Sequence, residues 1–189
     1  TGSSFASPLV AGVASLMLSA RPELTPRDLR LLLTQGQAVR PHTWQATLPT
    51  CSPLVPTQGA CNCTTTTCGA GMLDAATAVT AAANDPIVRI DVTPAQPAAG
   101  TAFTLTSAQT AVVAGRSIAS YNWTLVSGGG IVSSLSGANT ASASATPTAG
   151  GSFIVTLTVT DSLGETGSQT VEVNVTGAPP SSGGGGALG

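Results

Sequence analysis

Charged residues are scarce in this chain. Only 7% of its 189 residues are Asp, Glu, Lys or Arg, lysine is absent, and the formal net charge is -2. A protein that binds nucleic acid through the phosphates needs a cluster of basic side chains, which six arginines in a net acidic chain do not provide. The composition therefore predicts no nucleic-acid partner.

Aromatic residues and long hydrophobic runs are also few. Phe, Trp and Tyr make up 3% of the chain, which is too little for the aromatic stacking surface of a carbohydrate-binding module. The most apolar stretch, residues 9–20, contains Gly and Ser and is shorter than the ~20 residues that a transmembrane helix needs. Gly, Pro, Ser, Thr and Ala dominate the rest, which favours a secreted protein of one or two domains.

Histidine occurs once, at His42, between Pro41 and Thr43. These neighbours predict a surface loop, and we assign His42 no catalytic role. A serine nucleophile needs a base within hydrogen-bonding reach. If this chain holds a nucleophile, we expect its base to come from residues outside this sequence.

The first twelve residues carry a dense motif. A glycine and two serines lead directly into an apolar helical pattern, Gly2-Ser3-Ser4-Phe5-Ala6-Ser7-Pro8-Leu9-Val10-Ala11-Gly12. This layout predicts that the Ser4 hydroxyl lies at the positive end of a helix, beside free backbone N–H groups that suit an oxyanion. An arbitrary serine at such a place is more often a helix cap. The run as a whole, however, closely resembles the nucleophile motif of subtilisin-like serine peptidases, Gly-Thr-Ser-Met-Ala-(Ser/Thr)-Pro-His-Val-Ala-Gly.

An α/β-hydrolase is the competing type of serine enzyme. Its nucleophile elbow needs Gly two residues after the serine, where this chain has Ala6, and its histidine lies much farther downstream than His42. Subtilisin-like enzymes place Asp and His before Ser, so the resemblance implies a triad acid and base upstream of Thr1.

The resemblance also implies a function and the roles of two serines. It implies a secreted serine endopeptidase that cleaves protein or peptide substrates. Ser4 would be the nucleophile and a backbone N–H donor of the oxyanion hole, and the Ser3 hydroxyl would support the oxyanion region. Because the base is expected upstream, we expect the chain by itself to be inactive.

Residues 1–83 are predicted to be largely helical. Residues 8–20 are apolar nearly all round, which is typical of a helix buried inside a large domain, and Pro8 would occupy its first turn. Thr25 is expected to cap a second helix that begins at Pro26. Residues 69–79, with Asp74 as the expected cap, resemble the segment that closes subtilisin-like catalytic domains. We therefore interpret residues 1–83 as the C-terminal portion of an α/β domain, in which a parallel sheet is packed with helices.

Four cysteines lie in a loop rich in Pro, Thr and Gly: Cys51, Cys61, Cys63 and Cys68. Their spacing lacks the paired Cys-x2-Cys pattern of a structural zinc site and favours two disulfides. A bridge from Cys61 to Cys63 would close a strained ring. Two arrangements stay open, Cys51–Cys61 with Cys63–Cys68 or Cys51–Cys63 with Cys61–Cys68, and we favour the first. No cofactor or metal is expected in this chain.

The hydrophobic period changes from helical to alternating in residues 86–176. Apolar and polar residues alternate in five short runs, which predicts strands of an all-β sandwich, around residues 88–93, 103–106, 121–125, 155–160 and 171–175. The Tyr121-Asn122-Trp123 run and residues 153–164 resemble a PKD-type immunoglobulin-like domain. Tyr121 and Trp123 are expected in its core. Asp161 is expected to act in a turn, with calcium binding as the alternative.

Residues 177–189 are rich in Gly, Pro and Ser and are predicted to be a flexible tail. Such spacers sometimes precede a membrane or sorting segment, so we expect a secreted or cell-surface protein from a bacterium. Whether a segment after the tail attaches the protein to the cell surface is left open. A structural calcium ion in the complete enzyme is also left open by the resemblance. The alternative function is a non-catalytic adhesion or display protein whose active part is the sandwich.

Overall fold

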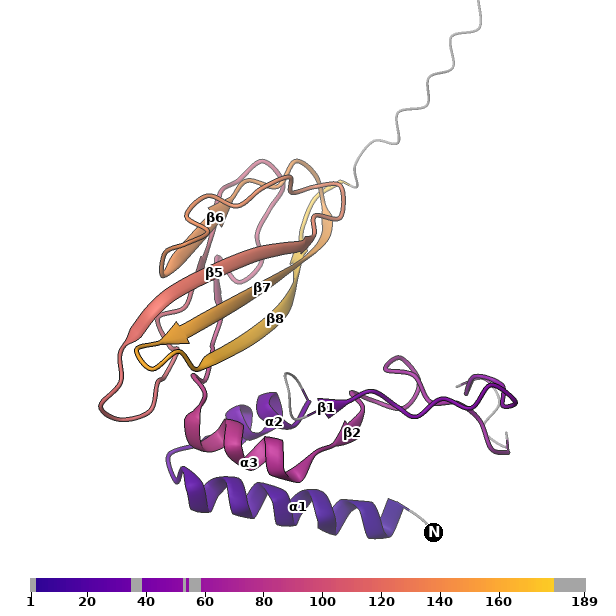
Figure 1. Ribbon diagram of the computed structural model, residues 1–189. Helices are drawn as coiled ribbons and strands as arrows, with labels where there is room; N and C mark the ends of the chain where they lie inside the picture. Colours follow the sequence, from indigo (N-terminus) through magenta and orange to yellow (C-terminus); the bar gives the residue numbers. More distant parts are fainter. Residues whose placement is uncertain (1–2, 35–38, 53, 55–58, 179–189) are drawn as a thin grey trace, which may run out of the picture. The chain divides into compact units, whose positions relative to one another are not determined.

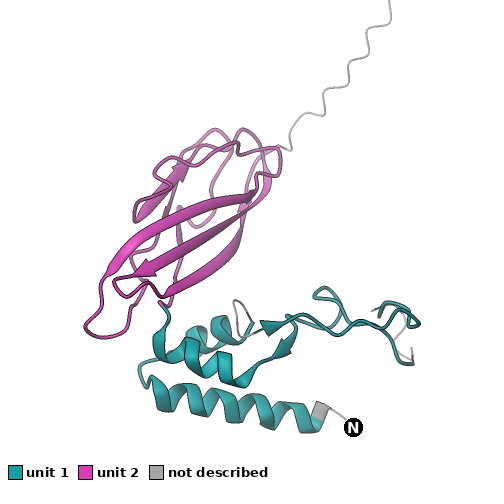
Figure 2. Ribbon diagram, in the orientation of Figure 1, with its two compact units in different colours: residues 1–85 teal, residues 86–189 magenta. Residues whose placement is uncertain are grey.

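The computed structural model describes residues 3–34, 39–52, 54 and 59–178. The chain divides into two compact units, residues 1–85 and residues 86–189 (Figure 2). The tail predicted from residue 177 onward lies almost wholly outside the described residues. Among those described, no helix has the length and apolar character needed to cross a bilayer.

The described residues of the first unit form three helices and a short antiparallel strand pair (Figure 1). The helices are α1 (Ser3–Ala20), α2 (Pro26–Thr34) and α3 (Ala75–Asn84), and α3 packs on both of the others. The strands β1 (Val39–Arg40) and β2 (Met72–Leu73) pair at the base of the cysteine loop. The parallel sheet implied by the resemblance is not found among the described residues of this unit.

The start of α1 differs from the expectation. The helix begins at Ser3 rather than at Pro8, so Pro8 lies inside it. Proline has no N–H to donate to the carbonyl four residues earlier, and that carbonyl belongs to Ser4. Because the first turns of α1 are exposed, water can satisfy the carbonyl, and the helix continues through the proline.

Side-chain caps define the beginnings of the other two helices. The Thr25 hydroxyl accepts a hydrogen bond from the Asp28 N–H at 3.3 Å, and the Asp28 carboxylate accepts one from the Thr25 N–H at 2.9 Å, which makes a reciprocal capping box. The Asp74 carboxylate accepts a hydrogen bond from the Thr77 N–H at 3.1 Å. The predicted caps Thr25 and Asp74 are both confirmed.

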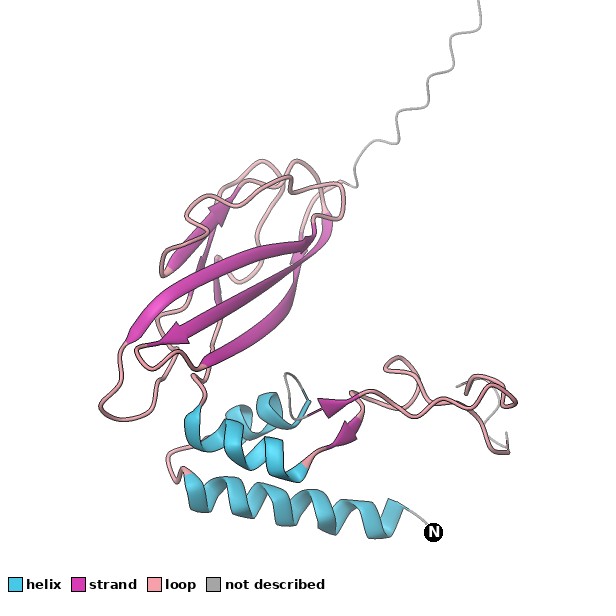
Figure 3. Ribbon diagram, viewed as in Figure 1, coloured by secondary structure: helices cyan, strands magenta, loops and turns pink. Residues whose placement is uncertain are grey.

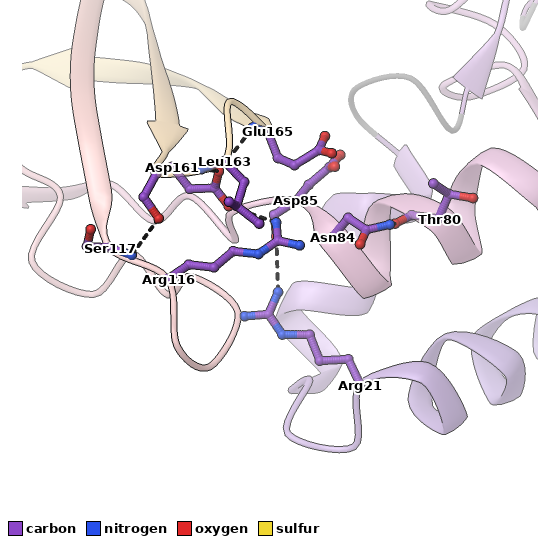
Figure 4. Close-up of polar contacts among 10 residues, drawn as sticks. Arg21, Thr80, Asn84, Asp85, Arg116, Ser117, Asp161, Leu163 and Glu165 are labelled. Carbon is purple, nitrogen blue, oxygen red and sulfur yellow. Dashed lines mark hydrogen bonds and ion pairs between the residues drawn. The ribbon is translucent and has the colours of Figure 1, made fainter.

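Arg21 is the buried cation of the first unit. It follows α1 directly and is 4% exposed. Its guanidinium donates from Nη1 to the Asp85 carbonyl at 3.0 Å and from Nε to the Glu23 carboxylate at 3.1 Å. Figure 4 shows the contact with Asp85. These bonds tie the end of α1 to the end of α3 and satisfy a charge that would otherwise be costly to bury.

The second unit is a sandwich of two antiparallel sheets (Figure 3). One sheet has the order β3-β4-β6, from β3 (Asp91–Thr93), β4 (Phe103–Thr106) and β6 (Ser142–Ala145). The other has the order β5-β7-β8, from β5 (Ile118–Ser127), β7 (Gly151–Asp161) and β8 (Thr166–Val175). The all-β, immunoglobulin-like class predicted for this region is confirmed.

Apolar residues that alternate along these strands fill the space between the sheets. Phe103 and Phe153 lie with ring centroids 5.2 Å apart, and each is 1% exposed. Trp123 is 4% exposed, and its indole N–H donates to the Thr140 carbonyl at 2.9 Å, so its single polar atom is satisfied. Trp123 is therefore a core residue, as predicted, and Tyr121 packs against the same core.

The strand expected at residues 88–93 is shorter in the structure. Val88 and Ile90 are buried in the core, but only residues 91–93 belong to β3. The Ile90 N–H donates to the side-chain oxygen of Gln169 at 2.7 Å instead of to a strand backbone. The Gln169 side chain on β8 thus takes the place of the backbone carbonyl that a neighbouring strand would offer to Ile90. The alternation of apolar and polar residues in the sequence could not reveal this substitution.

Candidate functional site

Ser4 lies in the first turn of α1 and is exposed. The N–H groups of the first four helical residues have no acceptor within the helix, and the helix dipole concentrates partial positive charge there. The Ser4 side chain and backbone N–H are therefore both at a helix end that favours a developing negative charge. The side chain of Ser3, like Gly2, lies outside the described residues, so the predicted support from Ser3 stays a prediction.

The α1 helix that carries Ser4 is apolar on faces that the described residues of its unit leave exposed. Val13 and Met17 are buried, whereas Phe5 is 74%, Leu9 72% and Leu16 57% exposed. The sequence predicted a helix buried on several sides, and among the described helices and strands its main packing partner is α3. A continuous exposed apolar surface of this kind normally marks contact with another protein surface.

An apolar groove of about 490 Å³ lies beside this helix. Val10 of α1, Leu29 and Leu33 of α2 and Leu73 of β2 line it, with Arg30 as a polar residue among the lining groups. The groove shares Val10 with the exposed face of α1. It therefore extends that uncovered surface rather than forming a separate polar site.

His42 lies at the base of the cysteine loop, and its observed hydrogen-bond partner among the described residues is a backbone carbonyl. Its Nε2 is 3.2 Å from the Gly69 carbonyl oxygen. This contact connects His42, before the cysteine loop, with Gly69, directly after it. This placement agrees with the surface-loop role predicted from Pro41 and Thr43, and the described residues bring no base and acid together with Ser4.

The cysteine loop is closed by two disulfides, Cys51–Cys61 and Cys63–Cys68. This is the first of the two arrangements left open by the sequence, and no cysteine is free. Between the disulfides lies Asn62, which is 2% exposed. Its amide donates to the Gln45 carbonyl at 2.8 Å and to the Leu48 carbonyl at 2.7 Å, and its oxygen accepts from the Gln45 N–H at 2.8 Å.

Sequence reasoning missed Asn62, although a polar amide between two cysteines was visible. It also missed two ion pairs that stabilise the ends of elements. Arg40 of β1 pairs with Asp74, and hydrogen bonds from the Thr77 N–H and then from Arg40 hold the Asp74 pKa below its ordinary value.

Arg116 and Asp161 form the second ion pair, in the sandwich (Figure 4). The Arg116 guanidinium donates to Asp161 Oδ2 at 2.8 Å, and Oδ1 accepts from the N–H groups of Leu163 and Glu165 at 2.9 and 3.0 Å. The hydrogen bond from Arg116, with those from the turn, lowers the pKa of Asp161 although its burial acts in the opposite direction. Asp161 therefore has the predicted turn role.

Two family models match the chain, one in each unit. Residues 1–76 match the subtilase family, and residues 93–175 match a PKD domain. The subtilase match includes Ser4, the cysteine loop and the Asp74 cap. No curated protein matches the chain at a significant level.

The solved structures that match part of the chain include two PKD domains and a structure of carbohydrate-binding modules. The PKD1 domain of Epp from Vibrio anguillarum is 24% identical, covers 51% of this chain and 99% of its own, and gives a TM-score of 0.37. The PKD domain from the KIAA 1837 protein is 28% identical, covers 51% and 94%, and gives a TM-score of 0.37. A structure of carbohydrate-binding modules from the β-sandwich superfamily is 22% identical and gives a TM-score of 0.39. The match covers 50% of this chain and 35% of that chain, so this chain spans about a third of its length.

Proposed function

We propose that this chain, which carries a subtilase segment followed by a PKD domain, is part of a secreted serine endopeptidase with Ser4 as its nucleophile. The observation that carries the proposal is the position of Ser4 in the exposed first turn of α1, within the matched segment. Support for secretion comes from the two disulfides, which persist in oxidising compartments.

The proposed reaction begins with attack of the Ser4 hydroxyl on the carbonyl carbon of a protein or peptide substrate. A histidine upstream of Thr1 takes the hydroxyl proton, and an upstream aspartate orients that histidine. The Ser4 backbone N–H donates to the oxyanion together with an upstream asparagine side chain, and the Ser3 hydroxyl supports this region. The histidine then protonates the leaving amine, and water hydrolyses the acyl-enzyme on Ser4.

The rest of the proposed enzyme would also cover α1. Phe5, Leu9 and Leu16 expose apolar surface next to the nucleophile, and a catalytic domain with its sheet in place would bury it. The chemistry itself requires no cofactor. The proposal also includes a calcium ion with a structural role in the complete enzyme and attachment to the cell surface through a segment after the tail.

The test is a pair of variants in the complete enzyme. Ser4→Ala should lower the rate of casein digestion by on the order of 10⁴- to 10⁶-fold, because the nucleophile of a triad cannot be replaced by its partners. Ser19→Ala is the matched control, since Ser19 is exposed near the other end of α1 and its hydroxyl only donates to the Ser15 carbonyl. Undiminished digestion by Ser4→Ala would overturn the proposal.

A further inference from the structure

Three asparagines of this chain stand in the acceptor signal for N-linked glycans. The signal is Asn, then any residue except Pro, then Ser or Thr, and it is modified in exported proteins. The chain has it at Asn62-Cys63-Thr64, Asn122-Trp123-Thr124 and Asn174-Val175-Thr176. A transferase must also reach the amide nitrogen and bend the chain around it, and the structure separates the three asparagines on these grounds.

Asn62 is closed to modification in the folded loop. It is 2% exposed and lies between the two disulfides. Its Nδ2 donates to the Gln45 carbonyl at 2.8 Å and to the Leu48 carbonyl at 2.7 Å, which uses both of its hydrogens. A sugar on Nδ2 would replace one of these hydrogens and leave a buried carbonyl without its donor.

Asn122 is exposed but lies in the middle of a long strand. It belongs to the ten-residue β5 and is in register with Thr158 of β7. The next residue, Trp123, is 4% exposed in the core of the sandwich. Bending this segment into the active site of a transferase would pull the tryptophan out of the core, which is costly for so large a side chain.

Asn174 is exposed near the end of β8, the edge strand of its sheet. Among the residues that the structure describes, its amide makes no hydrogen bond. Val175 and Gly151 form the last pair of the ladder, and beyond it Thr176 donates to the Pro97 carbonyl from its N–H at 2.9 Å and from its hydroxyl at 3.2 Å. Release of this short end would expose one valine, a smaller cost than removing a tryptophan.

An acidic side chain accompanies Asn174 on its face of the sheet. Glu172 is exposed, and because side chains alternate along a strand, it lies on the same face as Asn174. A carboxylate in this position can pair with an arginine of a transferase through a charge-assisted hydrogen bond. The residues in the corresponding position before the other two asparagines are uncharged, Ser120 and Ala60.

We propose that Asn174 is an acceptor site for an N-linked glycan, with Glu172 as the residue that a transferase recognises. The Asn174 Nδ2 forms a bond to the anomeric carbon of an oligosaccharide carried on a lipid pyrophosphate. The bond from that carbon to the phosphate oxygen breaks, the lipid pyrophosphate leaves with the electron pair, and the amide loses one proton to a base of the transferase. The proposal depends on export, which is part of the proposed function, and not on Ser4.

The test is export of the 189-residue chain into the periplasm of a bacterial host. The host carries an oligosaccharyltransferase that selects for an acidic residue two positions before the asparagine, together with its lipid-linked oligosaccharide. We expect one glycan per chain, mapped to Asn174 by mass spectrometry of its peptide, and none in Asn174→Gln. An unmodified chain, or a glycan at Asn62, would overturn the proposal. Because a supplied signal peptide directs export and Ser4 takes no part, the result is independent of peptidase activity.

Two further variants test the reasons for choosing Asn174. Glu172→Gln should lower the occupancy of Asn174 about tenfold, since the loss of one charge-assisted contact costs roughly that factor in affinity. Ser120→Glu gives Asn122 the same acidic residue but leaves it in the middle of β5, so Asn122 should stay unmodified. Unchanged occupancy in Glu172→Gln would contradict recognition through the carboxylate. Modification of Asn122 in Ser120→Glu to the level of Asn174 would contradict the role of the strand end. Both substituted side chains are exposed, so the β-type circular dichroism spectrum should be unchanged.

Discussion

The two units of this chain differ in how completely they bury their apolar residues. The sandwich encloses large side chains such as Phe103, Phe153 and Leu157, which are at most 1% exposed. The helical unit buries mainly Met17 and the alanines of α3, while Phe5 and Leu9 are more than 70% exposed. Hydrophobic burial is the main favourable term in folding. We therefore expect the sandwich to be stable by itself, and the helical unit to need contacts outside residues 1–85 for its stability.

Separate expression of the two units is the strongest test of this difference in burial. Residues 86–178 should unfold cooperatively, with a β-type circular dichroism spectrum, because their core is complete. Residues 1–85 should aggregate or remain partly folded, because α1 presents apolar surface to water. A soluble, cooperatively folded 1–85 unit would show that its exposed helix needs no cover.

A pair of phenylalanine variants measures the same difference within the whole chain. Phe153→Ala should destabilise the sandwich by about 3–5 kcal/mol, because it leaves a cavity in a closed core. Phe5→Ala should change the free energy of unfolding by less than about 0.5 kcal/mol, because its ring is exposed. Urea unfolding checks both, and comparable losses would mean that Phe5 has a packing partner in this chain.

Acid should weaken the sandwich through Asp161. The folded-state pKa of its carboxyl is lowered by Arg116 and the turn, so the unfolded chain binds more protons as the pH falls. The resulting stabilisation is present above the ordinary aspartate pKa of about 3.9 and is lost as the pH falls through the lower folded-state value. Asp161→Asn should remove this dependence below the ordinary aspartate pKa, seen as a flatter plot of melting temperature against pH in acid. An unchanged plot would contradict the role of this ion pair.

The sequence predicted elements where one local signal decides the structure. Alternation of Val155, Leu157 and Val159 identified β7, and the caps Thr25 and Asp74 marked helix starts, because each depends on near neighbours. Sequence reasoning failed where the structure of a segment depends on a group far away in the sequence. The Ser142–Ala145 strand has only small side chains and is formed by pairing with β4, and the start of β3 depends on Gln169, 79 residues from Ile90.

The candidate site shows the same limit. The helical position of Ser4 follows from the local motif, although the start of α1 was placed five residues too late because proline was expected in the first turn. The organising role of Asn62 depends on the carbonyls of Gln45 and Leu48, which the folded loop brings near. The proposed triad is a long-range arrangement, and Ser4 is the member of it that we assign to this chain.

Site-mapped labelling with a fluorophosphonate probe tests the central claim most directly, since the probe reacts only with a serine that a base has activated. In the complete enzyme, the account predicts one modified residue, Ser4, identified by mass spectrometry of its peptide. In the 189-residue chain it predicts no modification, because the base that we propose lies upstream of Thr1. Labelling of a different serine in the complete enzyme would contradict the account, as would labelling of Ser4 in the 189-residue chain that disappears in His42→Ala.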